Sequence, residues 1–347
     1  MSVAAAPADG WRMPAEWQPH ERTWMAWPPA GYSLGDTDAE AASAHACWAA
    51  VANAIGRFEP VTMLASAADL DGARALLDPG VTVLEAPLDD AWMRDIGPTF
   101  VIGPDGRLAG VDWVFNGWGA QSWATWEKDA LISARVCEAA GVPTVASPMI
   151  NEGGGIHVNG EGTVLVTRTV QLGQGRNENW TAADVEAELR RTLGVDRVIW
   201  VERGLTRDYD RFGTRGHIDI VACFVNADTV LFHDQRNPKH PDFAVSAEVH
   251  RTLAAEGDLR LVPLPAPEVL RDDEGWVDYS YVNHLVVNGG VILCAFDDPG
   301  DERAAQILRD AYPGREVVLV DARPLFARGG GIHCITQQQP ATTPESR

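Results

Sequence analysis

The sequence RGGGIHCIT at residues 328–336 places three glycines ahead of a histidine and a cysteine. Glycine is used where the backbone must take a positive φ or come close to a ligand. The cysteine that follows, with His333 beside it, is a candidate nucleophile, although a free cysteine is more often buried and inert in a strand. The rest of the chain helps to decide between these interpretations, because it repeats the local order of this stretch.

Five stretches share the order of a polar loop residue, a strand, a tight turn, a second strand, a helix and a third strand. Their loop residues are Asp95, His157, His217, Asn283 and His333. Recurrence at a regular interval indicates a repeat architecture. We therefore expect an α/β fold of repeated ββαβ-type units, closed into a five-bladed α/β propeller whose first blade is completed by the N-terminal segment. The polar loop residues would then meet at one end of the central axis.

A chain of 347 residues can form one large domain or two ordinary ones. The repeats favour one catalytic domain over residues 13–340, with flexible ends at 1–12 and 341–347. Hydrophobic periodicity and turn residues predict the individual elements. Among them are a strand at 22–27, helices at 39–57, 126–140 and 181–193, a hairpin turn at 103–106 and strands at 142–146 and 316–320.

The net charge of −21 disfavours a nucleic-acid partner, because such binding depends on cationic contacts to phosphate. A cationic substrate is compatible with it. The five cysteines are odd in number and lack Cys-x-x-Cys spacing, which argues against a disulfide framework and a zinc ribbon. The N-terminus does not resemble a signal peptide, and no apolar stretch is long enough to span a membrane. We expect a cytoplasmic protein with no membrane partner.

The candidate catalytic residues are Cys334, His217, Asp219 and Asp95. In a strand, residues two apart point to the same face, so His217 and Asp219 would stand together. Taken singly, each has an ordinary structural explanation as an exposed strand edge or a turn cap. Together they supply a thiol, an imidazole and two carboxylates. Glu152 is a further candidate residue for the same site.

Two carboxylates in one pocket repel each other unless a cation lies between them. A planar guanidinium matches paired carboxylates well, and Trp92 could cover its face. Gly330, in the glycine loop, is expected to lie against the substrate. The thiolate would attack the guanidinium carbon, and His217 would protonate the leaving ammonia and then deprotonate water. This chemistry requires no metal and no cofactor.

Five motifs resemble the agmatine deiminase family of the guanidine-modifying (pentein) superfamily, which also contains peptidyl-arginine and arginine deiminases. They are MPAEWQPHERTWMAWP at 13–28, DAWMRDIGPTFV at 90–101, NEGGGIHVNGEGTVL at 151–165, GHIDI at 216–220 and GGGIHCITQQQP at 329–340. The resemblance implies a pentein fold, a covalent amidino-cysteine intermediate and, for agmatine, the products N-carbamoylputrescine and ammonia on the route to putrescine. It also implies a homodimer.

The resemblance assigns the nucleophile to Cys334, the His-x-Asp pair to His217 and Asp219, and the guanidine-binding aspartate to Asp95. It matches Glu152 to the acid before the family's glycine run. The chain departs from the family pattern in three places, which could change how the pocket treats the substrate's tail. These departures are Gly331 in place of Asn, Ile220 in place of Asn and the segment 29–35 in place of a polar Asn-Trp-Arg segment.

Four interpretations therefore remain open from the sequence. The first is a thiol-dependent guanidine hydrolase acting on agmatine, arginine, peptidyl-arginine or another small guanidine. The second is an amidinotransferase on the same fold, in which an amine resolves the intermediate. The third is a metal-dependent ureohydrolase, for which the sequence has no Asp and His cluster. The fourth is a propeller that binds a ligand without chemistry.

Overall fold

The computed structural model describes residues 10–342, and in that range the chain has a mixed α/β fold with five sheets of three or four strands. In spatial order the strands are β18 (Thr336–Pro340), β1 (His20–Ala26), β2 (Val61–Ala65) and β3 (Thr82–Glu85); β4 (Thr99–Ile102), β5 (Leu108–Val114) and β6 (Thr144–Ile150); β7 (Ile156–Val158), β8 (Thr163–Thr167) and β9 (Arg197–Val201); β10 (Ala222–Phe224), β11 (Thr229–Asp234) and β12 (Arg260–Pro265); and β15 (Leu285–Val287), β16 (Gly290–Ala295) and β17 (Glu316–Asp321). A separate two-stranded ribbon pairs β13 (Arg271–Asp272) with β14 (Gly275–Trp276).

The sheets share one connectivity. Four of them start with an antiparallel hairpin and continue, through a helix, to a parallel third strand. The other sheet pairs β1 antiparallel with β18 and parallel with β2, so the first and last strands of the described chain lie side by side. A parallel pair requires a crossover, which explains why a helix separates each second strand from its third.

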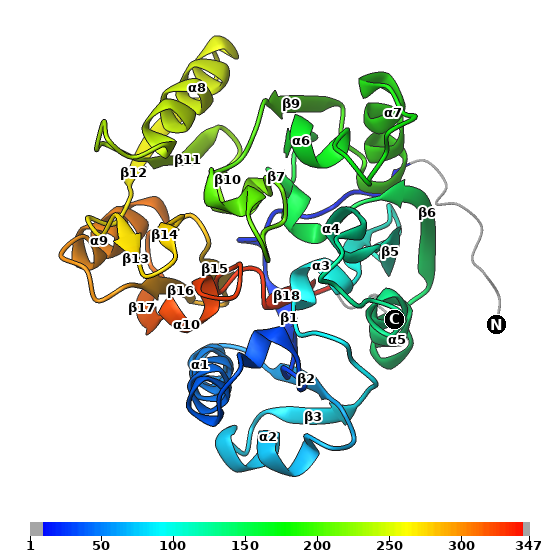
Figure 1. The fold of residues 1–347 in the computed structure, drawn as a ribbon. Helices are drawn as coiled ribbons and strands as arrows, with labels where there is room; N and C mark the ends of the chain where they lie inside the picture. The colour runs from blue at the N-terminus through cyan, green and yellow to red at the C-terminus, as the bar shows by residue number, and fades with distance from the viewer. Residues whose placement is uncertain (1–9, 343–347) are drawn as a thin grey trace.

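The helices cover the outside of these sheets. Figure 1 shows the long helices at the periphery and β1, β18 and α3 near the centre. The helices are α1 (Asp38–Gly56), α2 (Leu70–Leu76), α3 (Met93–Ile96), α4 (Gly117–Ala120), α5 (Ile132–Ala140), α6 (Arg168–Gln171), α7 (Ala182–Leu193), α8 (Asp242–Ala255), α9 (Asp301–Ala311) and α10 (Arg323–Phe326). Short 3₁₀ turns are η1 (Tyr32–Leu34), η2 (Asp129–Leu131), η3 (Gly153–Gly155), η4 (Arg207–Tyr209) and η5 (Ile218–Ile220).

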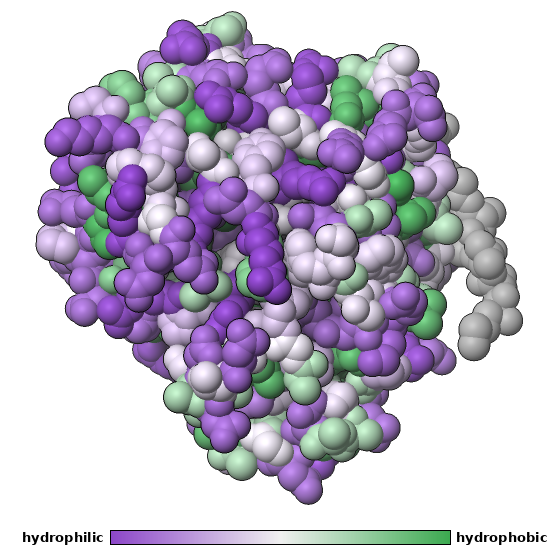
Figure 2. All heavy atoms as spheres, viewed as in Figure 1, coloured by the Kyte–Doolittle hydropathy of each residue, from purple (hydrophilic) through white to green (hydrophobic). Residues whose placement is uncertain are grey.

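Buried hydrophobic side chains form three clusters rather than one. The largest lies around β1, β2, α1, β15, β16 and α9, the second around β5, β8 and α7, and the third around β10, β11 and α8. Each cluster therefore lies where sheets pack against their own crossover helices. The face drawn in Figure 2 is mainly hydrophilic, with hydrophobic side chains scattered over it. In the described residues, no helix has the length and apolar character needed to cross a membrane.

Most predicted elements are present within a residue or two. The hairpin at 103–106 joins β4 to β5, and Thr181 caps α7 in a reciprocal capping box with Asp184. The helix predicted at 126–140 is wrong in its first turn, because α5 begins at Ile132. There the Asp89 carboxylate accepts the backbone N–H of Lys128 at 2.8 Å and so fixes the preceding turn.

The ends predicted to be flexible, 1–12 and 341–347, are only partly described by the structure. Residues 1–9 and 343–347 lie outside the described range. Within that range, Arg12 exchanges two backbone hydrogen bonds with Ile102, at 3.0 and 2.9 Å, and the N–H of Ala341 donates to Pro19. Residues 12 and 341 therefore join the fold.

Candidate active site

The glycine loop presents the Cys334 thiol between two other segments. Gly329 has φ +101, which a side chain would strain, whereas Gly330 is needed for space. A Cβ on Gly330 would lie 2.7 Å from the Trp92 ring and 3.0 Å from Cys334 Sγ. Residues 332–335 form turns, and β18 starts only at Thr336, so Cys334 is not in a strand. The thiol is buried.

Asp95 belongs to the short helix α3 and lines the same cavity as Cys334. The backbone N–H of Arg94 donates to the Cys334 carbonyl at 3.0 Å, which fixes α3 against the cysteine turn. The Asp95 carboxylate accepts hydrogen bonds from the Gly154 N–H at 3.0 Å and from Trp118 Nε1 at 2.9 Å. Burial raises the pKa of Asp95 to about 6, and Asp219 adds to the rise. Asp95 is therefore an ionised, immobilised acceptor above that pH.

His217 lies between Asp95 and Glu152. Its Nε2 is 3.3 Å from Glu152 Oε2, and its Nδ1 is 3.8 Å from Asp95 Oδ1. Arg176 Nε donates to both Glu152 oxygens at 3.1 Å, so Glu152 orients His217 and is itself held. Burial alone would lower the pKa of His217, but Asp95 and Glu152 outweigh it and raise the pKa to about 9. The imidazole is therefore protonated at neutral pH.

Asp219 contacts the nucleophile directly. Its Oδ2 lies 3.4 Å from Cys334 Sγ and accepts a 2.8 Å hydrogen bond from His333 Nδ1. Burial acts against ionisation, but the bond and charge of His333 hold the pKa of Asp219 below its ordinary value. Its Oδ1 is buried with no hydrogen-bond partner, and His217 Nδ1 is in the same condition. Both atoms therefore remain free to form a hydrogen bond with a ligand bound beside the thiol.

The prediction that His217 and Asp219 share one face of a strand is wrong. Asp219 lies in η5, and His217 precedes it. The reason is Asp208, whose carboxylate accepts the backbone N–H groups of Thr214 and Gly216 at 2.6 Å and of His217 at 3.1 Å. These donors are the ones that a strand would offer to a neighbouring strand. The two residues still reach one site, with separate partners.

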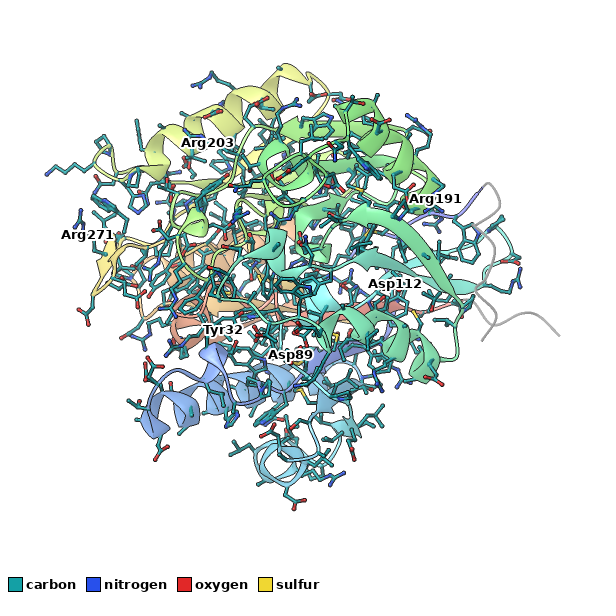
Figure 3. The ribbon with its side chains drawn as sticks, turned by 45° about the vertical axis from the view of Figure 1, so that its right-hand side comes forward. Tyr32, Asp89, Asp112, Arg191, Arg203 and Arg271 are labelled. Atoms are coloured by element: carbon teal, nitrogen blue, oxygen red, sulfur yellow. The ribbon has the colours of Figure 1, made fainter. Side chains whose placement is uncertain are left out.

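A small cavity of about 10 Å³ lies beside the thiol. Its lining consists of Tyr32, Trp92, Asp95, Trp118, Phe212, Thr214, Gly329 and Cys334. Tyr32 and Phe212 stack with centroids 4.7 Å apart, and the Trp92 indole donates to the Tyr32 hydroxyl at 2.7 Å. Figure 3 shows Tyr32 near the middle of the molecule, close to Asp89. A volume of this size holds about one water, so a larger ligand enters only when the wall moves.

The predicted site residues are therefore brought together. Cys334, Asp95, Trp92 and the glycine loop surround the cavity, whereas His217, Asp219 and Glu152 lie directly behind it. The three departures from the family pattern have separate positions. Tyr32 of segment 29–35 forms part of the wall, a Cβ on Gly331 would lie 2.4 Å from Asn283 Oδ1, and Ile220 is buried in the third hydrophobic cluster.

Sequence reasoning missed several residues of the site. Asn283 Nδ2 lies 3.2 Å from Cys334 Sγ, and its Oδ1 accepts the His333 N–H at 3.0 Å. The repeated order placed Asn283 among the loop residues expected to meet near the central axis, but the sequence analysis gave it no role at the site. Tyr32 lies in the segment 29–35, which was expected to affect the substrate's tail, but it was not singled out. Trp118 and Phe212 had no such signal, because an aromatic residue at a cavity wall is indistinguishable in sequence from one in a core.

The surroundings of Cys334 favour the neutral thiol when no cation is bound. Burial raises the pKa of Cys334 well above its usual value, and the carboxylates of Asp219 and Asp95 raise it further. The hydrogen bond from Asn283 acts in the opposite direction. A cation placed between these carboxylates and the sulfur would favour the thiolate, because an opposite charge nearby stabilises the charged form.

A buried thiol, a protonated imidazole and fixed carboxylates suit cleavage of a guanidino C–N bond, and comparison with known proteins indicates an enzyme of this class. The family model of the Porphyromonas-type peptidyl-arginine deiminase matches residues 12–340. A Streptomyces coelicolor protein named "Putative agmatine deiminase" is 57% identical over 95% of this chain and 99% of its own. The agmatine deiminase of Stutzerimonas stutzeri is 42% identical, with 96% of each chain covered.

A solved structure gives the same result. That of the Enterococcus faecalis agmatine deiminase has a TM-score of 0.89 and 31% identity, and the match covers 96% of this chain and 97% of the other. The chain belongs to the agmatine deiminase family.

Proposed function

We propose that the protein hydrolyses agmatine to N-carbamoylputrescine and ammonia through a covalent amidino-cysteine intermediate. The observation that carries the proposal is the placement of Cys334 Sγ beside two fixed carboxylates, Asp219 at 3.4 Å and Asp95 across the same small cavity. Planar guanidinium groups pair with carboxylates through parallel N–H bonds. The relatives named agmatine deiminase support the choice of substrate.

The first half-reaction forms the intermediate. Asp95 and the free Oδ1 of Asp219 accept N–H groups of the guanidinium, whose charge favours ionisation of Cys334. The proton of the thiol passes to bulk water. The thiolate attacks the guanidinium carbon and forms a C–S bond. His217 donates its proton to the departing nitrogen, the C–N bond breaks, and ammonia leaves.

The second half-reaction regenerates the thiol. A water molecule attacks the amidino carbon, and neutral His217 accepts its proton. The C–S bond then breaks, the thiolate regains a proton, and a ureido product is released. Glu152, held by Arg176, keeps the imidazole in place in both steps.

The residues that line the cavity affect which substrate tail can bind. Among the described residues that line it there is no Lys or Arg, whereas Tyr32, Trp92, Trp118 and Phe212 supply aromatic faces. An α-carboxylate would therefore meet no cation among the lining residues themselves, although the Arg211 guanidinium lies 4.5 Å from the centroid of the Phe212 ring. An aliphatic chain or an ammonium group can pack on aromatic rings. This contrast favours agmatine over arginine, whereas a peptidyl-arginine, whose α-carboxyl group is in a peptide bond, is distinguished only by the measurement below.

The substrate preference can be measured directly. We expect kcat/KM for agmatine to exceed that for arginine by about 100-fold or more, which corresponds to about 2.7 kcal/mol. Ammonia release is followed with agmatine, arginine and a blocked arginine peptide side by side, with and without an acceptor amine. Equal turnover of arginine would contradict the assignment of the tail site. Release of putrescine in place of ammonia, with transfer of the amidino group to the added amine, would support the alternative, an amidinotransferase.

The pH dependence of the activity follows from two groups whose pKa values are shifted. Asp95, with a pKa of about 6, must be ionised to hold the cation, so activity falls as pH drops below it. His217, with a pKa of about 9, must be protonated to act as the first acid, so activity falls as pH rises above it. We expect a bell-shaped kcat/KM profile that loses about tenfold per pH unit outside these limits. A profile flat from pH 5 to 10 would contradict both assignments.

We also propose that the five sheets are the blades of one closed α/β propeller, a single domain over residues 13–340. The repeated connectivity and the pairing of β1 with β18 support this arrangement. We propose a cytoplasmic location, because all five cysteines are free and buried, as suits a reducing compartment. The homodimer and the absence of nucleic-acid and membrane partners stay predictions.

A further inference from the structure

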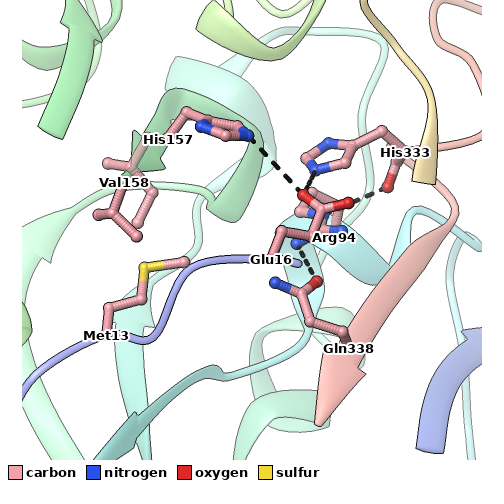
Figure 4. Close-up of a pocket in the computed structure, with 8 residues that line it drawn as sticks. Met13, Glu16, Arg94, His157, Val158, His333 and Gln338 are labelled. Atoms are coloured by element: carbon pink, nitrogen blue, oxygen red, sulfur yellow. Dashed lines mark hydrogen bonds and ion pairs between the residues drawn. The ribbon is translucent and has the colours of Figure 1, made fainter. Parts of the chain in front are cut away.

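A buried polar cluster lies on the other side of Asp219 from the substrate cavity. Figure 4 shows Glu16, from the segment before β1, between His157 and His333, with Arg94 and Gln338 close by. His333 Nε2 lies 3.1 Å from Glu16 Oε2, and His333 Nδ1 lies 2.8 Å from Asp219 Oδ2. A continuous chain of contacts therefore runs from Glu16 through His333 and Asp219 to Cys334 Sγ.

The chain has a fixed direction of donation. An ionised carboxylate only accepts hydrogen bonds, so an imidazole between two carboxylates must donate from both nitrogens. His333 is therefore the donor to Asp219 and to Glu16. Glu16 is anchored in turn, because its Oε1 accepts the Val286 N–H at 2.9 Å.

The arrangement leaves the two Asp219 oxygens with different roles. Oδ2 is occupied by His333 and faces the thiol, whereas Oδ1 is buried without a partner. Without His333, the carboxylate could rotate and its orientation would be undetermined. The mechanism does not otherwise use His333 or Glu16, although both are buried and charged.

We propose that Glu16 and His333 are positioning residues for Asp219: Glu16 fixes the imidazole of His333, and His333 holds Oδ2 so that Oδ1 stays available to the guanidinium. This inference rests on the proposed function. Asp219 contacts the substrate, and the pair acts through it.

Other charges face these groups and stay unchanged in the test. Arg94 Nε donates to the His333 carbonyl at 3.3 Å, and the His157 ring lies 6.4 Å from the His333 ring. The charge of His333 adds to burial in lowering the pKa of His284. Around the thiol, the charged neighbours are Asp219, Asp95 and Arg94.

Two substitutions at His333 separate the two contacts. The amide nitrogen of Asn follows the same bond path as Nδ1 and can still donate to Asp219, but it cannot reach Glu16. The amide nitrogen of Gln follows the path of Nε2 and can still reach Glu16, but it cannot donate to Asp219. We expect His333→Asn, which keeps the contact with Asp219 but loses the anchor on Glu16, to lower kcat/KM by about tenfold, and His333→Gln to raise KM and lower kcat/KM by about 100-fold.

Glu16→Leu tests the other half of the pair. In the wild type it should lower kcat/KM by about tenfold, because the imidazole loses its anchor. In the His333→Asn background it should have less than about a threefold effect, because Asn has no contact with Glu16. An equal effect in both backgrounds would overturn the coupling between Glu16 and Asp219.

A second readout does not depend on the substrate. The rate of Cys334 alkylation by iodoacetamide is followed against pH, with the labelled peptide identified by mass spectrometry. His333→Gln leaves the charge of Asp219 unpaired beside the sulfur. The pH at which the alkylation rate reaches half of its maximum should therefore rise by about one unit. His333→Asn should raise it by less than half as much. If wild-type protein does not turn over agmatine, the proposed function fails, and the alkylation series still tests this inference.

His157→Gln is the matched control. His157 is a buried histidine of the same cluster, 3.8 Å from Glu16 Oε2, but it has no contact with Asp219. Its kcat/KM and alkylation midpoint should stay within about threefold and about 0.3 pH units of the wild type. Equal losses in His333→Asn and His333→Gln, or a loss in His157→Gln as large as in His333→Gln, would overturn the proposal and indicate a structural role only.

Discussion

Replacing Cys334 by alanine abolishes ammonia release from agmatine while the protein stays folded. The substitution removes the atom that forms the covalent bond, and loss of a nucleophile in a preorganised site costs about 10⁴-fold or more in kcat. The sulfur is buried beside the cavity, so its removal enlarges a space that already exists. The free energy of unfolding should fall by only about 1 kcal/mol.

The control for this variant is Cys47→Ala. Cys47 is also a buried free thiol, but it lies in α1, and its Sγ donates to the Asp321 carbonyl at 3.2 Å, away from the cavity. Its removal should leave kcat unchanged within about twofold. Steady-state ammonia release and thermal unfolding are measured for both variants. Retained turnover in Cys334→Ala would refute the cysteine mechanism.

Replacing His217 by asparagine should lower kcat by about 10³-fold, within the usual range for general acid–base catalysis. Both half-reactions lose their proton carrier, and Asp95 loses the neighbour that opposes its raised pKa. In the profile of kcat/KM against pH, the decline above pH 9 should disappear, whereas the decline on the acidic side should begin at a higher pH. Glu152 keeps its bonds to Arg176, so the fold around it should persist.

His240→Asn is the comparison for this prediction. His240 is a buried histidine whose Nδ1 lies 3.6 Å from Asp242, but it is not among the residues around Cys334. Its replacement should leave the kcat/KM profile and both limbs in place. A profile for His217→Asn that kept its alkaline limb would assign that limb to another group.

The elements that the sequence predicts well are those set by local pattern. The helix at 181–193 has its cap residue and apolar spacing in the sequence, and the hairpin at 103–106 has its turn residues. Asp95 and Cys334 could be placed because each follows a loop in a repeated order. These features depend on neighbours a few positions apart.

The elements that it misses depend on contacts between distant residues. His333 pairs with Asp219, 114 positions away, and Tyr32 stacks on Phe212 from another unit. The Asp208 carboxylate accepts the backbone N–H groups of Gly216 and His217, which a strand would instead donate to a neighbouring strand. No local pattern reports such contacts, so the pairing of His217 with Asp219 was predicted wrongly even though both lie in the site.

The measurement that tests the central claim most directly is mass spectrometry of the protein quenched in acid during turnover of agmatine. The account predicts an adduct equal to agmatine less ammonia, located on the peptide that contains Cys334 and absent from the Cys334→Ala protein. An adduct on a different cysteine, or full ammonia release from protein whose Cys334 had first been alkylated, would contradict it.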